Sequence, residues 1–263
     1  MKIGVSTASF YPLETELSLE EVGKHGVKLT ELFFNAEMEL KPSFVDMLAD
    51  IKDSYGMEIP SIHTTMSLAE SFMIFSRYER RFRESLNQFA IYSEAAAKLG
   101  AKYIVMHGGK PNGLLTDEEY CERYMMLKEV TKKNGVTVLQ ENVKNHRSSD
   151  REFLLSMIDI LGDEAEFCYD VKQALRSGYE PIGLLEDIIG NVKHLHISDH
   201  SVASDCLLPL NGNFDFKSFF TKLKNFGYNG SAVIEVYKDA YNSYDEIFES
   251  HKNIKNLGVE IFG

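Results

Sequence analysis

The stretch HLHISDH (194–200) brings together three histidines and an aspartate, residue types that bind metal ions or transfer protons. His196 lies near the end of an apolar run, and we assign it to a metal ion. His194 lies two residues earlier on the same strand face, so it lies deeper and is expected to be a hydrogen-bonded residue of the core or of the support around the site. Asp199 and His200 follow the run, where each either lines a pocket or faces water.

Five further apolar runs also end in a side chain that could do chemistry. Taken singly, each is a polar residue at the edge of a core, but an ordinary solvated edge would carry Lys, Ser or Asn just as readily. The repetition therefore indicates a shared site. The five residues are His63, His107, Glu141, Asp170 and Glu235.

Four of these side chains form a candidate metal site: Glu141, Asp170, His196 and Glu235. Three carboxylates and one imidazole suit a hard or borderline divalent cation, namely Mn²⁺, Zn²⁺ or Mg²⁺. Without a cation the three carboxylates would repel one another. We therefore expect one divalent cation and no organic cofactor.

The apolar runs that position these residues have the character of strands buried on both faces. They are short, rich in β-branched and aromatic residues, and mostly apolar rather than alternating. We predict strands at 2–7, 28–34, 56–63, 102–108, 135–142, 165–170, 192–198 and 231–236.

Amphipathic segments lie between the runs and are predicted to be helices. The segment 116–135 begins with Thr116 and Glu119, the spacing of a capping box, and ends at Gly135. The other predicted helices lie within 18–26, 42–56, 81–100, 149–162, 182–190, 214–227 and 243–258.

Eight strand–helix units of about 30 residues predict a (β/α)₈ TIM barrel, a fold of about 250 residues with its active site at the carboxyl ends of the strands. A doubly wound open sheet has the same alternation, but no GxGxxG fingerprint follows the first run. We find no low-complexity linker, so residues 1–263 are expected to form a single α/β domain.

The composition argues against several partners and compartments. The formal net charge of −12 disfavours nucleic acid and anionic membranes, which attract clustered Lys and Arg. No apolar stretch approaches a membrane span. Three cysteines without a CxxC pair, and a first segment unlike a secretion signal, predict a reduced, cytoplasmic protein.

The ordered motifs of the chain resemble the xylose isomerase-like TIM barrels, a family of sugar epimerases and isomerases that also includes the endonuclease IV DNA-repair enzymes. The resemblance extends over essentially the whole chain. It rests on ELFF, SIHTT, IVMHGG, VLQENV, CYDVKQALRSG, KHLHISD, D-x(5)-N-x-N-F-D-F and VIEV, in that order.

The resemblance implies roles for individual residues. The quartet Glu141, Asp170, His196 and Glu235 matches the metal ligands of the epimerase branch, in which Glu141 and Glu235 would also move the proton through a metal-stabilised enediolate. His63 and His107 match nuclease residues that bind a second zinc shared through Glu141, and Asp205 matches one ligand of a third. Three roles stay open for the two histidines: second-metal ligands, contacts to a sugar, or packed neutral residues.

Two departures from the family pattern weigh against DNA cleavage. Gln173 and Leu207 stand where the nucleases have zinc histidines, which leaves a third zinc with too few ligands. Gln173 also replaces a substrate-binding histidine of the epimerases, although its amide can still hydrogen-bond a sugar hydroxyl.

The favoured interpretation is therefore a metal-dependent isomerase or epimerase that acts on a small ketose or a related sugar phosphate or polyol. The alternatives are an endonuclease IV-like phosphodiesterase and a non-catalytic sugar-binding barrel; a dehydratase or lyase has the same sequence signature. Residues 64–80, with Arg77, Arg80 and Arg81, are either a pocket lid with a phosphate contact, a dimer surface or an ordinary helix start. The related barrels are often homo-oligomers, and the chain is compatible with this.

Overall fold

The computed structural model describes residues 1–67 and 69–263. Eight parallel strands close into a barrel in the order in which they occur along the chain, because β1 pairs with both β2 and β8. This confirms the predicted (β/α)₈ architecture. The strands are β1 (Lys2–Ser6), β2 (Thr30–Phe33), β3 (Ser61–His63), β4 (Tyr103–Met106), β5 (Thr137–Glu141), β6 (Phe167–Asp170), β7 (Val192–Ile197) and β8 (Ser231–Ile234).

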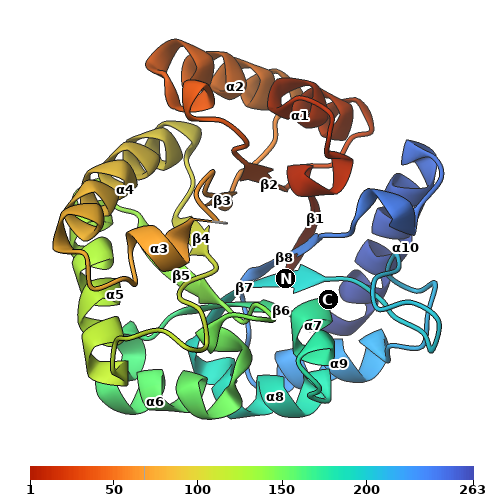
Figure 1. Cartoon of the computed structure of the whole chain (residues 1–263). Coiled ribbons are helices and arrows are strands. Elements are labelled where there is room, and N and C mark those ends of the chain that lie inside the picture. Colours follow the sequence, from red (N-terminus) through yellow and green to blue (C-terminus); the bar gives the residue numbers. More distant parts are fainter. Residues whose placement is uncertain (68) are drawn as a thin grey trace.

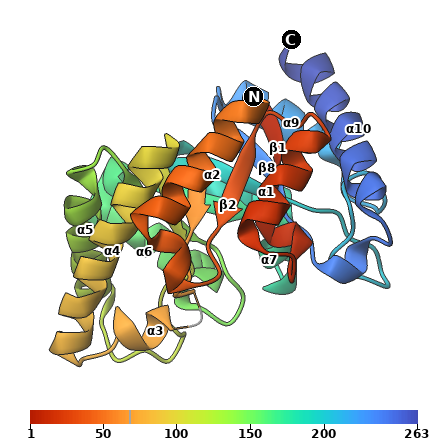
Figure 2. The same cartoon turned by 90° about the horizontal axis from the view of Figure 1, so that it is seen from above.

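Helices surround the strands in a ring (Figure 1). Seen at right angles, the short helix α3 lies at the end of the molecule opposite both chain termini (Figure 2). The helices are α1 (Thr15–Lys24), α2 (Pro42–Tyr55), α3 (Glu70–Met73), α4 (Glu79–Leu99), α5 (Asp117–Lys132), α6 (Arg151–Leu161), α7 (Val171–Arg176), α8 (Pro181–Ile188), α9 (Phe216–Asn225) and α10 (Tyr244–Phe262).

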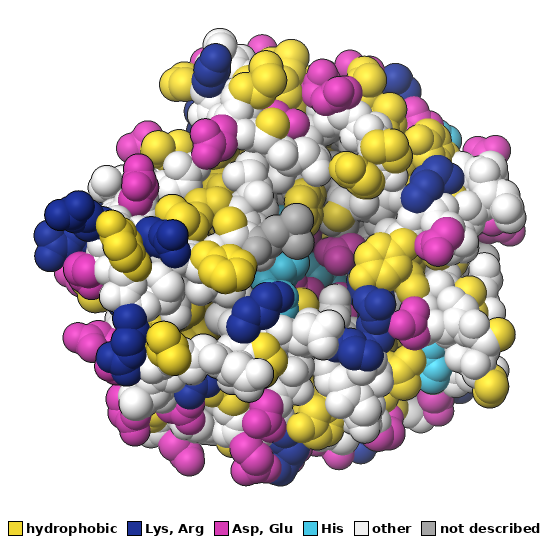
Figure 3. Space-filling view, in the orientation of Figure 1, with side chains coloured by type: hydrophobic (Ala, Val, Ile, Leu, Met, Phe, Trp, Pro, Cys, Tyr) yellow, Lys and Arg dark blue, Asp and Glu magenta, His cyan; other side chains and the backbone are white. Residues whose placement is uncertain are grey.

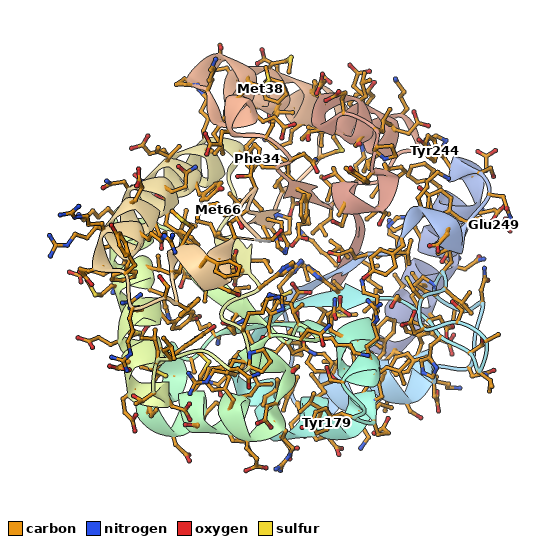
Figure 4. All side chains as sticks on the ribbon, viewed as in Figure 1. Phe34, Met38, Met66, Tyr179, Tyr244 and Glu249 are labelled. Atoms are coloured by element: carbon orange, nitrogen blue, oxygen red, sulfur yellow. The ribbon has the colours of Figure 1, made fainter. Side chains whose placement is uncertain are left out.

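The core has two parts, one on each side of the strands. The larger part lies between strands and helices; Phe34, which directly follows β2 on the inner side of α2, belongs to it (Figure 4). Inside the barrel, Val105, Leu139 and Cys168 form a small apolar layer. Because side chains alternate along a strand, this layer sets the position of the inward-facing residues two places further on, His107, Glu141 and Asp170.

The first and last helical units meet and complete the ring. Tyr244, at the start of α10, packs edge-on against Phe10 from the loop after β1, with ring centroids 5.2 Å apart (Figure 4). His251, further along α10, is within 3.0 Å of the carbonyl oxygen of Ile3 in β1. These contacts attach α10 to β1 and so support the pairing of β1 with β8.

The predicted strands and helices are all present near their predicted positions, but several begin or end at different residues. The run 56–63 forms strand only at Ser61–His63, since Pro60 has no N–H to donate to the ladder. Helices α3 and α7 were not predicted, because each is shorter than two turns and carries no clear periodicity. The capping box of α5 is confirmed: Glu119 N donates to Thr116 Oγ1 at 3.2 Å, and Thr116 N donates to Glu119 Oε2 at 2.8 Å.

Candidate metal and active site

The four predicted ligands meet at the carboxyl end of the barrel. Glu141 ends β5, Asp170 ends β6, His196 lies in β7 and Glu235 follows β8. Asp170 and His196 are direct partners in the strand register. One possible ligand atom from each of the four residues lies within 4.8 Å of those of the other three.

The imidazole of His196 joins the three carboxylates. Its Nδ1 lies 3.2 Å from Glu141 Oε1, 3.1 Å from Glu235 Oε2 and 3.8 Å from Asp170 Oδ2. The carboxylates of Glu141 and Asp170 are buried, whereas the Glu235 side chain is 17% exposed. Glu235 is therefore the most exposed of the four predicted ligands.

The polar atoms of this quartet suit a divalent cation. Glu141 Oε2, Asp170 Oδ2 and Glu235 Oε2 are buried and have no well-aligned hydrogen-bond donor among the described residues. The pKa of the Asp170 carboxyl is raised to about 6, mainly by burial. The charge of Lys172 lowers this pKa, whereas the charges of Glu141 and Glu235 raise it further. Buried oxygens without donors are costly unless a cation compensates them, so the donor set fits Mn²⁺, Zn²⁺ or Mg²⁺.

A buried layer beneath the quartet fixes the orientation of His196. The Nε2 atom of His196 lies 3.1 Å from Glu31 Oε1 in β2. His194, 3.3 Å from the other Glu31 oxygen, is also within hydrogen-bond distance of the hydroxyls of Ser61 and Ser231, which confirms its place in the hydrogen-bonded core. With Nε2 facing Glu31, Nδ1 of His196 is left for the ion, an arrangement common in metal sites.

Electrostatics favour an ionised carboxylate in this layer. Burial alone would raise the pKa of Glu31, but the charge of His196 and the hydrogen bonds with His194 and His196 lower it well below the ordinary value. Glu31 was missed in the sequence analysis. The available signal was a charged residue, Glu31, within the short and mostly apolar strand TELF.

His63 and His107 form a second group around the same glutamate. Their Nε2 atoms lie 3.5 Å and 3.3 Å from Glu141 Oε2. Phe33 stacks on the His63 ring with centroids 4.5 Å apart. Burial lowers the pKa of His107 to about 3, so its imidazole is neutral and has a free lone pair for a metal or a substrate hydroxyl.

Lys172 is a second residue that sequence reasoning missed. It lies in the first turn of α7, is 2% exposed, and places Nζ 3.4 Å from Asp170 Oδ2 and 3.5 Å from Glu235 Oε1. Although burial alone would lower the pKa of this amine, the charges of Asp170 and Glu235 raise it. The residue therefore brings a positive charge to the quartet.

The two remaining predicted residues lie at the edge of the site. Gln173 is largely buried, and its side-chain oxygen accepts a hydrogen bond from Lys144 N at 3.1 Å, so it joins α7 to the loop after β5. The Asp205 side chain is 51% exposed and pairs with Arg176 at 2.8 Å. The third-zinc position of the nucleases thus holds an ion pair in this chain.

Asp199 was expected either to line a pocket or to face water, and the structure gives it a third role. It is 1% exposed, so it does not face water. Its carboxylate accepts hydrogen bonds from the backbone N–H groups of His200, Gly212 and Phe214, at 2.7 to 2.9 Å. Its role is to hold the long loop after β7, and His200 packs against Phe214 in the same loop.

Within the segment 64–80, α3 lies at the rim of this end of the barrel, beside β4 and against α4 (Figures 1 and 2). Glu70 anchors it, because its buried carboxylate accepts hydrogen bonds from Thr64 Oγ1 at 2.9 Å and Gly108 N at 2.7 Å. Gly108 has a φ of +88°, and a Cβ there would lie 2.1 Å from the Tyr120 hydroxyl, so this turn requires glycine. Leu68, within the predicted lid, lies outside the described residues.

Arg77, within this segment, and Arg81, just after it, have contacts on the protein surface. Arg77 donates to the carbonyl oxygen of Leu114 at 2.8 Å and pairs with Glu119 at 2.9 Å. Arg81 lies over the ring of Tyr78, 5.2 Å from its centroid. These contacts favour a lid that is bonded to the neighbouring surface, and they argue against a phosphate contact by Arg77 or Arg81.

The surface of this end of the barrel is hollowed at its centre. Histidine and acidic side chains are visible at the bottom of the hollow, with hydrophobic and basic side chains around it (Figure 3). A polar centre of this kind, open to solvent on one side, can bind a small polar molecule directly above the quartet.

The chain belongs to the xylose isomerase-like TIM barrel family, whose model matches residues 19–257. The protein MJ1311 of Methanocaldococcus jannaschii, described as uncharacterized, is 26% identical over 274 residues, which cover 98% of this chain and 92% of that protein. Among the described residues, every helix is too short or too polar to cross a membrane.

Two solved structures illustrate the shared fold. A D-psicose 3-epimerase, crystallised in the presence of D-fructose, superposes with a TM-score of 0.81 and 12% identity, covering all of both chains. An IolI protein with a zinc atom superposes with a TM-score of 0.79 and 18% identity, again covering all of both chains. At these identities the likeness concerns the fold.

Proposed function

We propose that this protein is a metal-dependent sugar isomerase or epimerase that acts on a small ketose or a close derivative. The observation that carries the proposal is the quartet of Glu141, Asp170, His196 and Glu235, with three buried carboxylate oxygens facing a common centre. The similarity to an epimerase and to a zinc-containing protein of the same fold supports it.

The four residues of the quartet would have two different roles, ion binding and proton transfer, according to their positions. Asp170 and His196 would hold the cation, because both are buried and His196 is oriented from below by Glu31. When bound, the ion would polarise two neighbouring oxygens of an open-chain sugar and make the adjacent C–H bond more acidic. Glu141 and Glu235 come from strands on either side of this pair, so they can reach a substrate carbon from two sides.

Proton transfer is therefore assigned to Glu141 and Glu235. A carboxylate acts as a base only within hydrogen-bond reach of the proton that it removes, a geometry compatible with residues at the rim of the ion site. One glutamate would take the proton and the other would return it. His63 and His107 are assigned to contacts with the sugar hydroxyls, whereas Gln173 holds the backbone of Lys144 and Asp205 holds Arg176 at the rim.

The metal site is tested by native mass spectrometry on protein purified without chelator. We expect one divalent ion per chain, lost in His196→Ala. Solvent-deuterium exchange into ketoses, followed by NMR, then tests the reaction. Absence of an ion even after addition of Mn²⁺ or Zn²⁺ would refute the metal site.

The two glutamates are tested by Glu141→Gln and Glu235→Gln. Each variant should lower turnover by about 10²- to 10⁴-fold, because the amide cannot accept the proton. Circular dichroism should remain unchanged. Glu58→Gln, in an exposed ion pair with Lys2, is the matched control and should keep full activity. Near-wild-type turnover in either site variant would remove that glutamate from the mechanism.

A second ion is the specific alternative that the geometry raises. The ligand atoms of His63, His107 and Glu141 also lie within 4.8 Å of one another. Two zinc ions per chain in the mass spectrum would make these histidines ligands and would favour phosphodiester cleavage, which an abasic DNA substrate would then test. The ion pair of Asp205 with Arg176 and the leucine at position 207 argue against a third ion.

A further inference from the structure

Lys172 is buried directly against the candidate metal site. Its side chain is 1% exposed, and its ammonium lies between two of the predicted ligands, Asp170 and Glu235. The ring of Tyr237 covers it, with Nζ 4.7 Å from the centroid. A buried lysine is costly unless its charge is compensated, so these neighbours determine what it does.

The contacts of the ammonium are long for hydrogen bonds. Nζ lies 3.4 Å from Asp170 Oδ2, and 3.5 Å from both the carboxylate and the carbonyl oxygen of Glu235. Ordinary N–H···O bonds are about 2.7 to 3.2 Å long. The interaction is thus mainly one of charge.

The two oxygens of Glu235 face different cations. Oε2 lies 3.1 Å from His196 Nδ1, on the side of the quartet, whereas Oε1 faces Lys172. Lys172 therefore holds one oxygen of this carboxylate back from the centre. Asp170 differs, because the oxygen that faces Lys172 is the same one that faces His196.

In these positions, the ammonium of Lys172 and a divalent ion would compete for the same two carboxylates. In the metal-free protein, three carboxylates meet in a buried space, and Lys172 compensates part of their charge. A divalent ion in the quartet would lie close to the ammonium, and both would be attracted to Asp170 and Glu235. Like charges separated by a few ångströms in a buried site repel strongly.

We propose that Lys172 is a built-in counterion that stabilises the metal-free site, weakens the binding of the divalent ion, and limits Glu235 to one ligand oxygen. It is a positioning residue, acting through Asp170 and Glu235. The inference rests on the proposed function in requiring a cation at the quartet. A weakly held ion with open coordination positions leaves room for two substrate oxygens.

The test is the affinity of the chelator-treated protein for Mn²⁺, measured from the electron paramagnetic resonance signal of the free ion. Lys172→Met keeps the length of the side chain and removes the charge. We expect Mn²⁺ to bind about tenfold more tightly or better, because the repulsion is lost. A merely structural role predicts the opposite, since a damaged site binds metal less well.

Arg176→Met is the matched control. Arg176 lies one turn further along α7, over the same Tyr237 ring, and pairs with Asp205 rather than with the quartet. The same change in net charge should alter the affinity by less than about threefold at physiological ionic strength, where distant charges are screened. Lys172→Gln serves as a second neutral variant should the methionine variant fold poorly.

Equal or weaker Mn²⁺ binding in the Lys172 variants than in the wild type would overturn the inference, as would an equal gain in Arg176→Met. A variant that is less stable than the wild type without metal, and regains that stability with Mn²⁺, supports it. Failure of the wild type itself to bind Mn²⁺ or Zn²⁺ would overturn the metal site and the inference together, a result distinct from the others.

Discussion

At the scale of single residues, Glu31 supports the candidate site from beneath its predicted ligands. Its two oxygens lie 3.1 Å and 3.2 Å from His196 Nε2, and Ser61 Oγ donates to it at 2.8 Å. A carboxylate in this place selects the tautomer of His196 and prevents the ring from turning. The candidate ion site therefore includes a buried supporting layer beneath the four predicted ligands.

Glu31→Gln should weaken Zn²⁺ binding by about 10- to 100-fold, the usual cost of losing the carboxylate behind a metal-binding histidine. Competition with a chromophoric chelator measures this. Ser6→Ala is the matched control, because Ser6 Oγ makes only a 3.5 Å contact with the same carboxylate. Unchanged affinity in Glu31→Gln would show that His196 is oriented without it.

At the scale of elements, the buried carboxyl group of Glu70 ties α3 to the loop after β4. Burial raises the pKa of Glu70 to about 7, while the hydrogen bond from Gly108 N, the charge of His63 and the hydrogen bond from Thr64 act in the opposite direction. Because the folded-state pKa lies above the ordinary value of 4.5, ionisation of Glu70 opposes folding. Stability from this group is present at acidic pH and is lost as the pH rises through about 7.

Glu70→Gln should remove this pH dependence. Its amide can still bond both Thr64 and Gly108, so the variant should gain up to about 3 kcal/mol in unfolding free energy relative to wild type between about pH 5 and about pH 8. Urea unfolding at both pH values measures the difference. Glu84→Gln, on the exposed face of α4, is the control. A constant difference across pH would contradict the assignment to Glu70.

At the scale of the whole molecule, the candidate site joins four neighbouring strands. Its candidate ligands come from the ends of β5 and β6, from β7 and from the residue after β8. Strand β8 in turn pairs with β1. An ion bound there would connect half of a closed barrel. Since the ligands converge only in the folded chain, its binding energy would add directly to the stability of the fold.

Saturation with Zn²⁺ at about 100 times its Kd should therefore raise the unfolding free energy by about 2.7 kcal/mol. The midpoint of thermal unfolding, recorded with and without the ion, reports this gain. His196→Ala should show no gain. A metal-independent midpoint in the wild type would be evidence against an ion bound specifically by the native state.

Much of this protein was predictable from the order of its residues. Short apolar runs alternating with amphipathic segments specify a parallel barrel, because each strand is buried on both faces and each helix on one. The convergence of the candidate ligands was predictable for a related reason. The carboxyl ends of barrel strands share one face of the molecule, so a side chain at the end of each run, such as Glu141 or Asp170, must point toward the same space.

Only the tertiary structure decided which residues support that site. Glu31 in β2 is far in sequence from His196, and Lys172, although only two residues after Asp170, is far in sequence from Glu235. A lone charged residue carries no pattern that distinguishes a buried partner from a solvated one. Gln173, Asp199 and Asp205 stand beside functional motifs, yet their side chains hold loops or form an ion pair at the rim. Periodicity determines which elements form and which face is buried, but the partner of a polar side chain is set by packing between elements, which no local pattern records.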